Sequence, residues 1–268
     1  MTEELDELNR LFTSKNVDDI IKFYDYFDNA EQLIEWMKNR PSASMQIYEV
    51  EGDKDIVIVI PTADHNGEYA KNCANEIFKG QQIVFVESNG PFFNYARSSN
   101  FGLKYALRYN PNWIFLSNDD MYKIDDISIL KNELSKIVGK ADIVFTTLAE
   151  YRSRDISIYK SRLLLSLYRH INCYNSIKLK LWDKYNIKLL LRQINLIRRI
   201  FMKTVYTFKL TGSFSVISSH IVSEGGIFDE AFINAFEDVY FSYKISKGNI
   251  RISAIEFKVG DYGENHLV

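Results

Sequence analysis

The chain has 268 residues, of which 46% are hydrophobic and 25% are charged, a composition typical of soluble globular proteins. This length suits one large α/β domain or a domain with a small appendage. The two cysteines, Cys73 and Cys173, lie far apart, which argues against a disulfide framework or a zinc site. The sequence contains no run of roughly 18 apolar residues that would predict a transmembrane helix. The acidic start MTEELDELNR does not resemble a secretory signal, so we expect a cytoplasmic protein.

The net charge of −2 hides an uneven distribution of charge. Residues 151–205 contain 13 lysines and arginines but only two acids, whereas the rest of the chain is strongly acidic. Apolar residues in this segment recur at helical spacing beside basic ones, which predicts a basic helical insert. Two interpretations stay open: the insert lies on an anionic membrane surface, or it packs on the protein and exposes its charges. No nucleic-acid-binding module accompanies the charge, so we expect no nucleic-acid partner.

The first 50 residues are expected to form an N-terminal helical appendage. Apolar residues keep helical spacing over residues 2–40, until Pro41 ends the pattern. Asn16 is a suitable N-cap for a helix that starts with Val-Asp-Asp, because acidic residues favour the first turn. Nothing in this part of the sequence suggests catalytic chemistry.

From residue 51 onward, apolar runs of strand length alternate with segments of helix length. Strands are predicted at 56–60, 83–86, 113–116 and 142–147, with helices between them at 68–79, 98–109 and 127–138. After the insert, strands are predicted at 204–209 and 214–218, and helices at 220–224 and from about 235. This alternation predicts one α/β domain over residues 51–268, with a doubly wound, mostly parallel sheet between two layers of helices.

Two adjacent carboxylates, Asp119 and Asp120, follow the strand predicted at 113–116. Such a pair at the end of a buried strand is repulsive unless a cation neutralises it. Ligands of open α/β sheets bind at the carboxyl ends of the strands. These aspartates are therefore candidates for a hard divalent cation that arrives with a diphosphate. The alternative is an ordinary turn, which Asn and Asp also favour.

Four blocks of sequence, taken in order, resemble one known family. The blocks are IVIVIPT, then VFVESNGP, then ARSSNFGLKYAL with IFLSNDD, and finally TGSFSVIS with GGIFDEAF and FEDVYFSYK. Together they resemble the inverting GT-A glycosyltransferases, especially the large family-2-like group. The resemblance runs from Ile56 to about Ile245, apart from the insert. It implies a GT-A fold, a nucleotide-sugar donor, a divalent metal and a single-displacement reaction.

The resemblance also implies roles for particular residues in donor binding. Asn118-Asp119-Asp120 stands where the family has Asp-x-Asp, although here the first position is Asn. Asp120 would hold Mg²⁺ or Mn²⁺, Asp119 would hold the ribose or the water shell of the metal, and His266 would be a third metal ligand. The whole expected donor site comprises Pro61, Thr62, Asp64, Glu87, Asn89, Arg97, Asn100, Asn118, Asp119, Gly212 and Ser213.

Some of these roles have alternatives. Glu87 would reach the base at a position where the family often has Asp, and a UDP-sugar is favoured over a GDP- or dTDP-sugar. Arg97 would approach the donor phosphates, unless it is an ordinary helix arginine. Gly212 and Ser213 would lie where donor and acceptor meet. His65 and His220 are interpreted as loop and surface residues.

The Glu-Asp pair at 237–238 matches the family's catalytic motif. Asp238 would be the base that takes the proton of the acceptor hydroxyl, and Glu237 would position the acceptor or cap a helix. The alternative for both is a simple preference for carboxylates in the first turn of a helix.

The sequence therefore predicts an inverting, metal-dependent glycosyltransferase of the hexosyltransferase kind. Its acceptor would be a sugar or a lipid-linked molecule, reached at a membrane through residues 151–205. A nucleotidyltransferase is an alternative, but IPTADHNGEY lacks the glycine-rich, lysine-bearing loop expected after its first strand. A non-catalytic protein that binds a sugar or a partner on a GT-A scaffold is another, against which the presence of both Asp120 and Asp238 argues.

Overall fold

The computed structural model of the chain describes residues 2–146, 155–159, 204–209, 215–225, 227–232 and 236–262. The chain divides into two compact units. Residues 154–209 form the smaller unit, and segments 1–153 and 210–268 together form the larger one. The larger unit contains the central sheet and every predicted site residue that the structure describes.

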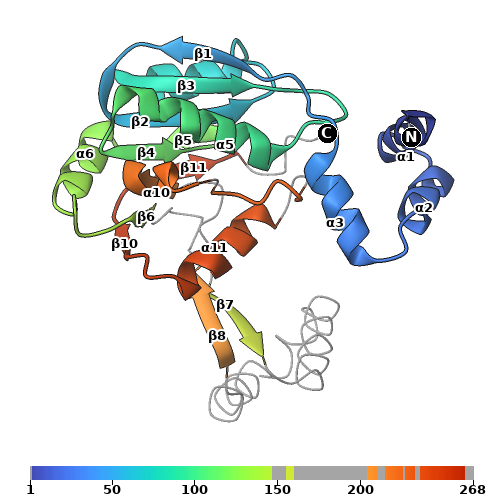
Figure 1. The fold of residues 1–268 in the computed structure, drawn as a ribbon. Helices are drawn as coiled ribbons and strands as arrows, with labels where there is room; N and C mark the ends of the chain where they lie inside the picture. Colours follow the sequence, from blue (N-terminus) through green and yellow to red (C-terminus); the bar gives the residue numbers. More distant parts are fainter. Residues whose placement is uncertain are drawn as a thin grey trace, which may run out of the picture. The chain divides into compact units, whose positions relative to one another are not determined.

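A seven-stranded mixed sheet forms the centre of the larger unit (Figure 1). Its strands are β1 (Gln46–Val50), β2 (Asp53–Thr62), β3 (Gln81–Glu87), β4 (Trp113–Leu116), β6 (Ile143–Thr146), β9 (Ser215–Ser218) and β10 (Ile252–Ile255). Their spatial order is β1-β3-β2-β4-β9-β6-β10. β2 is parallel to β3 and β4, and β6 is parallel to β10, whereas β1 and β9 run antiparallel to their neighbours. The carboxyl ends of β2, β3 and β4 therefore meet at one edge.

Helices cover both faces of the sheet because its strands point alternate side chains into two apolar layers. The elements outside the main sheet are α4 (Glu68–Asn72), a π-helical turn (Cys73–Ile77), α5 (Tyr95–Ala106), β5 (Met121–Lys123), α6 (Ile127–Ser135), α10 (Ser219–Ser223), α11 (Glu237–Lys247) and β11 (Val259–Asp261). Ile58 and Ile60 of β2 pack with α4, the π-helical turn and α6. Val57 and Val59 pack with α5, α10 and α11 on the other face. β5 and β11 form a separate two-stranded sheet.

The structure confirms an α/β fold with a mostly parallel sheet flanked by helices. The strands predicted at 56–60, 83–86, 113–116 and 142–147 are all present. The helix predicted at 98–109 begins earlier, at Tyr95, because the side chain of Asn94 caps it by accepting a hydrogen bond from the Arg97 N–H. The helix predicted at 68–79 changes into the π-helical turn at Cys73. The sequence did not predict β1, β5, β10 or β11, which are short strands.

The N-terminal segment forms three helices, as its periodicity predicted. These are α1 (Thr2–Phe12), α2 (Val17–Asp25) and α3 (Ala30–Asn39). Asn16 caps α2 by accepting a hydrogen bond from the Asp18 N–H, which confirms that prediction. The helices pack around their own apolar cluster, whose buried members are Leu8, Leu11, Phe23 and Met37.

The smaller unit differs from the predicted helical insert where it is described. β7 (Asp155–Tyr159) pairs antiparallel with β8 (Thr204–Lys209). The strand at 204–209 was predicted, but the prediction of a helical insert is wrong for residues 155–159, which alternate polar and apolar side chains as strands do. Residues 160–203 of the expected helical insert lie outside the described residues. No helix in the described part of the chain is long and apolar enough to cross a membrane.

Candidate active site at the carboxyl ends of the strands

The carboxylate turn after β4 lies directly beside the end of β2. The Thr62 hydroxyl donates a hydrogen bond of 2.6 Å to Asp119 Oδ2. The same hydroxyl oxygen accepts one of 3.2 Å from the Asp64 N–H. Asp119 is partly buried, and burial raises its pKa, although the hydrogen bond from Thr62 opposes this rise. The structure thus brings together Thr62, Asp64 and Asp119, which the sequence placed in one site.

Backbone atoms of this turn are held by several neighbouring elements. The Cys73 thiol donates to the Asp119 carbonyl at 3.2 Å. The Asn72 amide donates to the Met121 carbonyl at 2.9 Å. The Tyr262 N–H, at the end of β11, donates to the Asp120 carbonyl at 3.1 Å. The backbone of the turn is therefore fixed in place, and sequence reasoning identified none of these three supports.

The second pair of carboxylates opens α11. Asp238 Oδ1 accepts a hydrogen bond of 2.7 Å from the Val239 N–H. Glu237 is only 8% exposed, yet its Oε2 atom has no hydrogen-bond partner among the described residues. Burial raises the pKa of both carboxyls, and the charge of Asp238 raises that of Glu237 further. An unpartnered buried carboxylate oxygen is costly, which suggests a site built for a ligand.

Tyr95, the first residue of α5, connects the two pairs of carboxylates. Its hydroxyl donates a 3.0 Å hydrogen bond to Asn118 Oδ1 at the start of the carboxylate turn. Burial raises the pKa of Tyr95, and the charges of Glu237, Asp238 and Asp120 raise it further. Among the described residues, no lysine or arginine forms an ion pair with Asp119, Glu237 or Asp238. The cluster is thus strongly negative. Sequence reasoning missed Tyr95 because it precedes the predicted start of its helix.

A second group of polar residues lies at the end of β3. Glu87 Oε2 accepts hydrogen bonds from the His65 N–H at 3.0 Å and contacts His65 Nδ1 at 2.5 Å. The imidazole also stacks on Tyr48 of β1, with 3.4 Å between ring centroids. His65 lies in a loop, as interpreted from the sequence. Its contacts with Glu87 and Tyr48 were not predicted, because Tyr48 belongs to the unpredicted strand β1. Asp64, His65 and Glu87 offer ligand atoms within 4.8 Å of one another, an arrangement that exposed polar groups often adopt without a metal.

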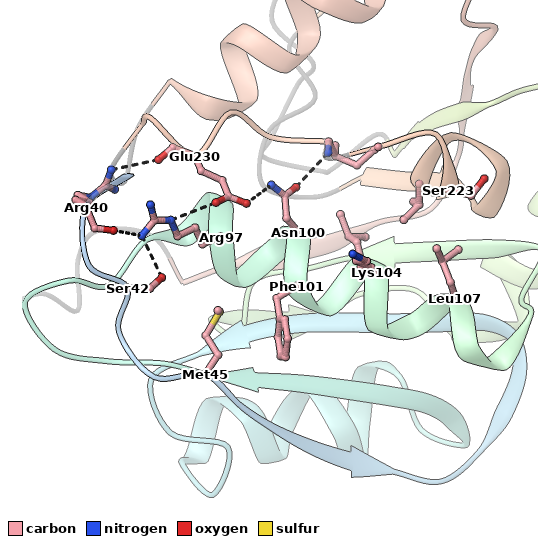
Figure 2. A pocket seen from close by; sticks show the side chains of 14 residues that line it. Arg40, Ser42, Met45, Arg97, Asn100, Phe101, Lys104, Leu107, Ser223 and Glu230 are labelled. Carbon is pink, nitrogen blue, oxygen red and sulfur yellow. Dashed lines mark hydrogen bonds and ion pairs between the residues drawn. The ribbon is translucent and has the colours of Figure 1, made fainter. Parts of the chain in front are cut away.

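Arg97 and Asn100 lie in a different environment from the carboxylate cluster (Figure 2). The Arg97 guanidinium donates to the carbonyls of Lys38, Arg40 and Pro41 and forms an ion pair of 3.2 Å with Glu230. Asn100 Oδ1 accepts the N–H groups of residues 227 and 228, and its amide donates to the Phe228 carbonyl and to Glu230.

These contacts account for both side chains within the fold, and the expected donor roles of Arg97 and Asn100 stay predictions. The hydrogen bonds of Arg97 and Asn100 join α5 to the end of α3 and to the loop at 227–232, so both residues have structural roles here. Both line a cavity of about 630 Å³ to which no residue of the carboxylate cluster contributes.

Pro61 is buried as the second-last residue of β2, and Asn89 is exposed, with its amide 3.5 Å from the Ala63 carbonyl. Gly212, Ser213 and His266 lie outside the described residues.

Comparison with known proteins adds nothing to the geometry: no family model and no curated protein matches this chain.

Proposed function

We propose that the chain is a metal-dependent inverting glycosyltransferase with a GT-A catalytic domain, which moves a sugar from a nucleotide-diphosphate donor to an acceptor hydroxyl. The observation that carries this proposal is that Tyr95 donates a hydrogen bond to Asn118, directly before Asp119 and Asp120, while the charges of Asp120, Glu237 and Asp238 all act on the same tyrosine. Sugar transfer needs a cation site for the leaving diphosphate and a base for the acceptor. The sequence resemblance gives these two tasks to the acidic segments 119–120 and 237–238.

The carboxylate turn has the chemistry of a site for Mg²⁺ or Mn²⁺. Hard divalent cations prefer carboxylate oxygens, and a cation would offset the burial that raises the pKa of Asp119. Asp120 would hold the metal with Asp119 beside it. Tyr262 brings the chain to Asp120 four residues before His266, the proposed third ligand. When bound, the metal stabilises negative charge on the leaving diphosphate.

Asp238 would act as the base. Its carboxylate takes the proton of the acceptor hydroxyl while the acceptor oxygen bonds to the anomeric carbon. The bond from that carbon to the nucleoside diphosphate breaks on the opposite side, which inverts the configuration. The raised pKa of Asp238 makes it a better proton acceptor than an exposed aspartate. The unpartnered Glu237 Oε2 is suited to accept a hydrogen bond from another acceptor hydroxyl.

The donor and acceptor follow from the same proposal. We favour a UDP-sugar, with GDP- and dTDP-sugars as the other donors to test, and an acceptor that is a sugar or a lipid-linked molecule. The excess of basic residues in 151–205 supports a peripheral position on an anionic membrane surface at the cytoplasmic side.

Thermal unfolding with UDP, GDP, dTDP and their common sugars, with and without Mn²⁺, tests the proposal. We expect one nucleotide to stabilise the protein only when Mn²⁺ is present, and Asp120→Ala to abolish this shift. Asp55→Ala, which removes an exposed aspartate, is the matched control and should keep it. The proposal fails if no nucleotide gives a metal-dependent shift. The same measurement with nucleoside triphosphates tests the nucleotidyltransferase, which stabilisation by triphosphates alone would favour. An assay of sugar transfer with the stabilising donor tests the non-catalytic protein, which binding without any transfer would favour.

A further inference from the structure

Residue 118 is the one position of the acidic turn where this chain has an amide instead of a carboxylate, and the structure shows what holds that amide. Asn118 Oδ1 accepts the hydrogen bond of 3.0 Å from the Tyr95 hydroxyl. The Asn118 carbonyl accepts a second one, of 2.8 Å, from the Ser117 hydroxyl. Both the side chain and the backbone of Asn118 are therefore fixed.

The nitrogen of the Asn118 amide, Nδ2, can donate hydrogen bonds to a ligand. Within the described residues its Nδ2 group makes no hydrogen bond, and the residue is only partly buried. An amide nitrogen is a donor of two hydrogen bonds and cannot accept one. Because Tyr95 occupies the oxygen, Asn118 presents donors to a ligand, where an aspartate would present acceptors.

The surroundings decide which ligand atoms would meet these donors. Tyr95 is close to the charges of Asp120, Glu237 and Asp238, so the neutral pair Tyr95–Asn118 lies among carboxylates. A hydroxyl-rich ligand would find acceptors there in excess, but an anionic oxygen would find few donors. Asn118 Nδ2 is a suitable donor for such an oxygen, and charge-assisted hydrogen bonds to phosphate are stronger than neutral ones.

We propose that Tyr95 is a positioning residue, which fixes the Asn118 amide so that its nitrogen donates to a diphosphate oxygen of the nucleotide donor. This inference rests on the proposed function, because it requires a diphosphate beside the carboxylate turn. Tyr95 itself touches no ligand atom in this arrangement. It acts only through Asn118.

Isothermal titration with UDP and Mn²⁺, and separately with inorganic diphosphate and Mn²⁺, tests this inference. Four proteins are compared with the wild type: Tyr95→Phe, Asn118→Ala, the double variant, and Tyr105→Phe. The last removes a tyrosine hydroxyl that contacts Glu49 and serves as the matched control. Losing one hydrogen bond should weaken binding roughly 3- to 10-fold in Tyr95→Phe and at least as much in Asn118→Ala. The double variant should bind like Asn118→Ala alone, since the two residues act as a unit.

The outcomes separate this inference from the proposed function. If the wild type binds neither probe in the presence of Mn²⁺, the positioning role is overturned, and if GDP and dTDP also fail to bind with Mn²⁺, the proposed function is overturned with it. If it binds but Tyr95→Phe binds equally well, or if the effect of Tyr95→Phe is undiminished in the Asn118→Ala background, only the positioning role is overturned. A loss of affinity for UDP without a loss for inorganic diphosphate would also overturn it. Unfolding midpoints of the variants, measured alongside, separate weaker binding from general destabilisation.

Discussion

Arg97 and Glu237 belong to two different polar clusters beside α5, and they differ in whether their hydrogen-bonding atoms have partners within the protein. At one, the Arg97 guanidinium is surrounded by backbone carbonyls and by Glu230, so its donors are used within the protein. At the other, Glu237 keeps an unpartnered oxygen, and burial raises the pKa of Glu237 and Asp238. A buried charged group whose donors are all used within the protein, as those of Arg97 are, stabilises the fold. A cluster that leaves like charges buried and uncompensated is suited to a ligand that supplies the missing partners.

This comparison divides the residues that carry the family resemblance. The Asn-x-Gly motif at 100–102 belongs to the satisfied cluster. Asn100 bonds to the loop at 227–232, and Gly102 packs against β2 and β3. The acidic motif at 237–238 belongs to the unsatisfied one. A motif can therefore recur because it builds the fold as well as because it binds a substrate.

Asp238→Asn gives the largest expected effect and tests the unsatisfied cluster. Removal of a general base lowers rates by about 10²- to 10⁴-fold, so we expect kcat for sugar transfer to fall within this range. Nucleotide affinity in the presence of Mn²⁺ should stay near that of the wild type, because Asp238 does not hold the donor in our proposal. Glu224→Gln, which removes an exposed carboxylate, is the control. Near-normal transfer by Asp238→Asn would contradict the assignment of the base.

Arg97→Ala tests the satisfied cluster. The substitution leaves several buried carbonyls and the Glu230 carboxylate without their donor, and breaking such a network costs about 3–5 kcal/mol of unfolding free energy. Chemical denaturation measures this loss. Arg10→Ala removes an exposed ion pair and should leave the stability nearly unchanged. If Arg97 instead held donor phosphates, its replacement would weaken nucleotide binding with little loss of stability.

The sequence predicted five of the seven strands of the main sheet, β2, β3, β4, β6 and β9, and the carboxylate turn, for a physical reason. The run IVIVI at 56–60 is buried on both faces, and the break after Leu116 coincides with the end of β4. Both features depend only on residues that are close together in the sequence, so the composition and spacing of those residues predict them.

What the sequence could not reveal depends on contacts between distant segments. β1 is recognisable only through its pairing with β3, and without β1 the stack of Tyr48 on His65 has no basis. Tyr95 became a site residue only because its helix starts three residues earlier than predicted and brings it to Asn118. The structural role of Arg97 similarly required the end of α3 and the loop at 227–232.

Gly102→Ala tests whether the packing of α5 on the sheet also matters for the site that contains Tyr95. A Cβ at this position would lie 2.5 Å from Val59 Cγ1 and 2.6 Å from Val86 Cγ2, so α5 would have to move away from the sheet. Overpacking of this kind costs about 1–3 kcal/mol of unfolding free energy. Because the same helix carries Tyr95, we also expect weaker nucleotide binding, which would be absent if α5 took no part in the site. Gly248→Ala, where an added Cβ meets only ordinary contacts, is a useful comparison.

Glu237→Gln should have the smallest effect, and it should stabilise the protein, whereas Arg97→Ala and Gly102→Ala should destabilise it. The folded protein holds the pKa of Glu237 above its unfolded value, so the folded state binds the proton more tightly. Its stability without metal therefore falls as the pH rises through the folded pKa, and is regained at lower pH. Glu237→Gln removes the charge and should stabilise the metal-free protein at neutral pH by about 0.5–2 kcal/mol, with a smaller gain at about pH 4, where the wild-type carboxyl is protonated. Thermal unfolding over this pH range measures both effects. A destabilised Glu237→Gln protein at neutral pH would mean that the carboxylate is already compensated, and the contrast between the two clusters would then fail.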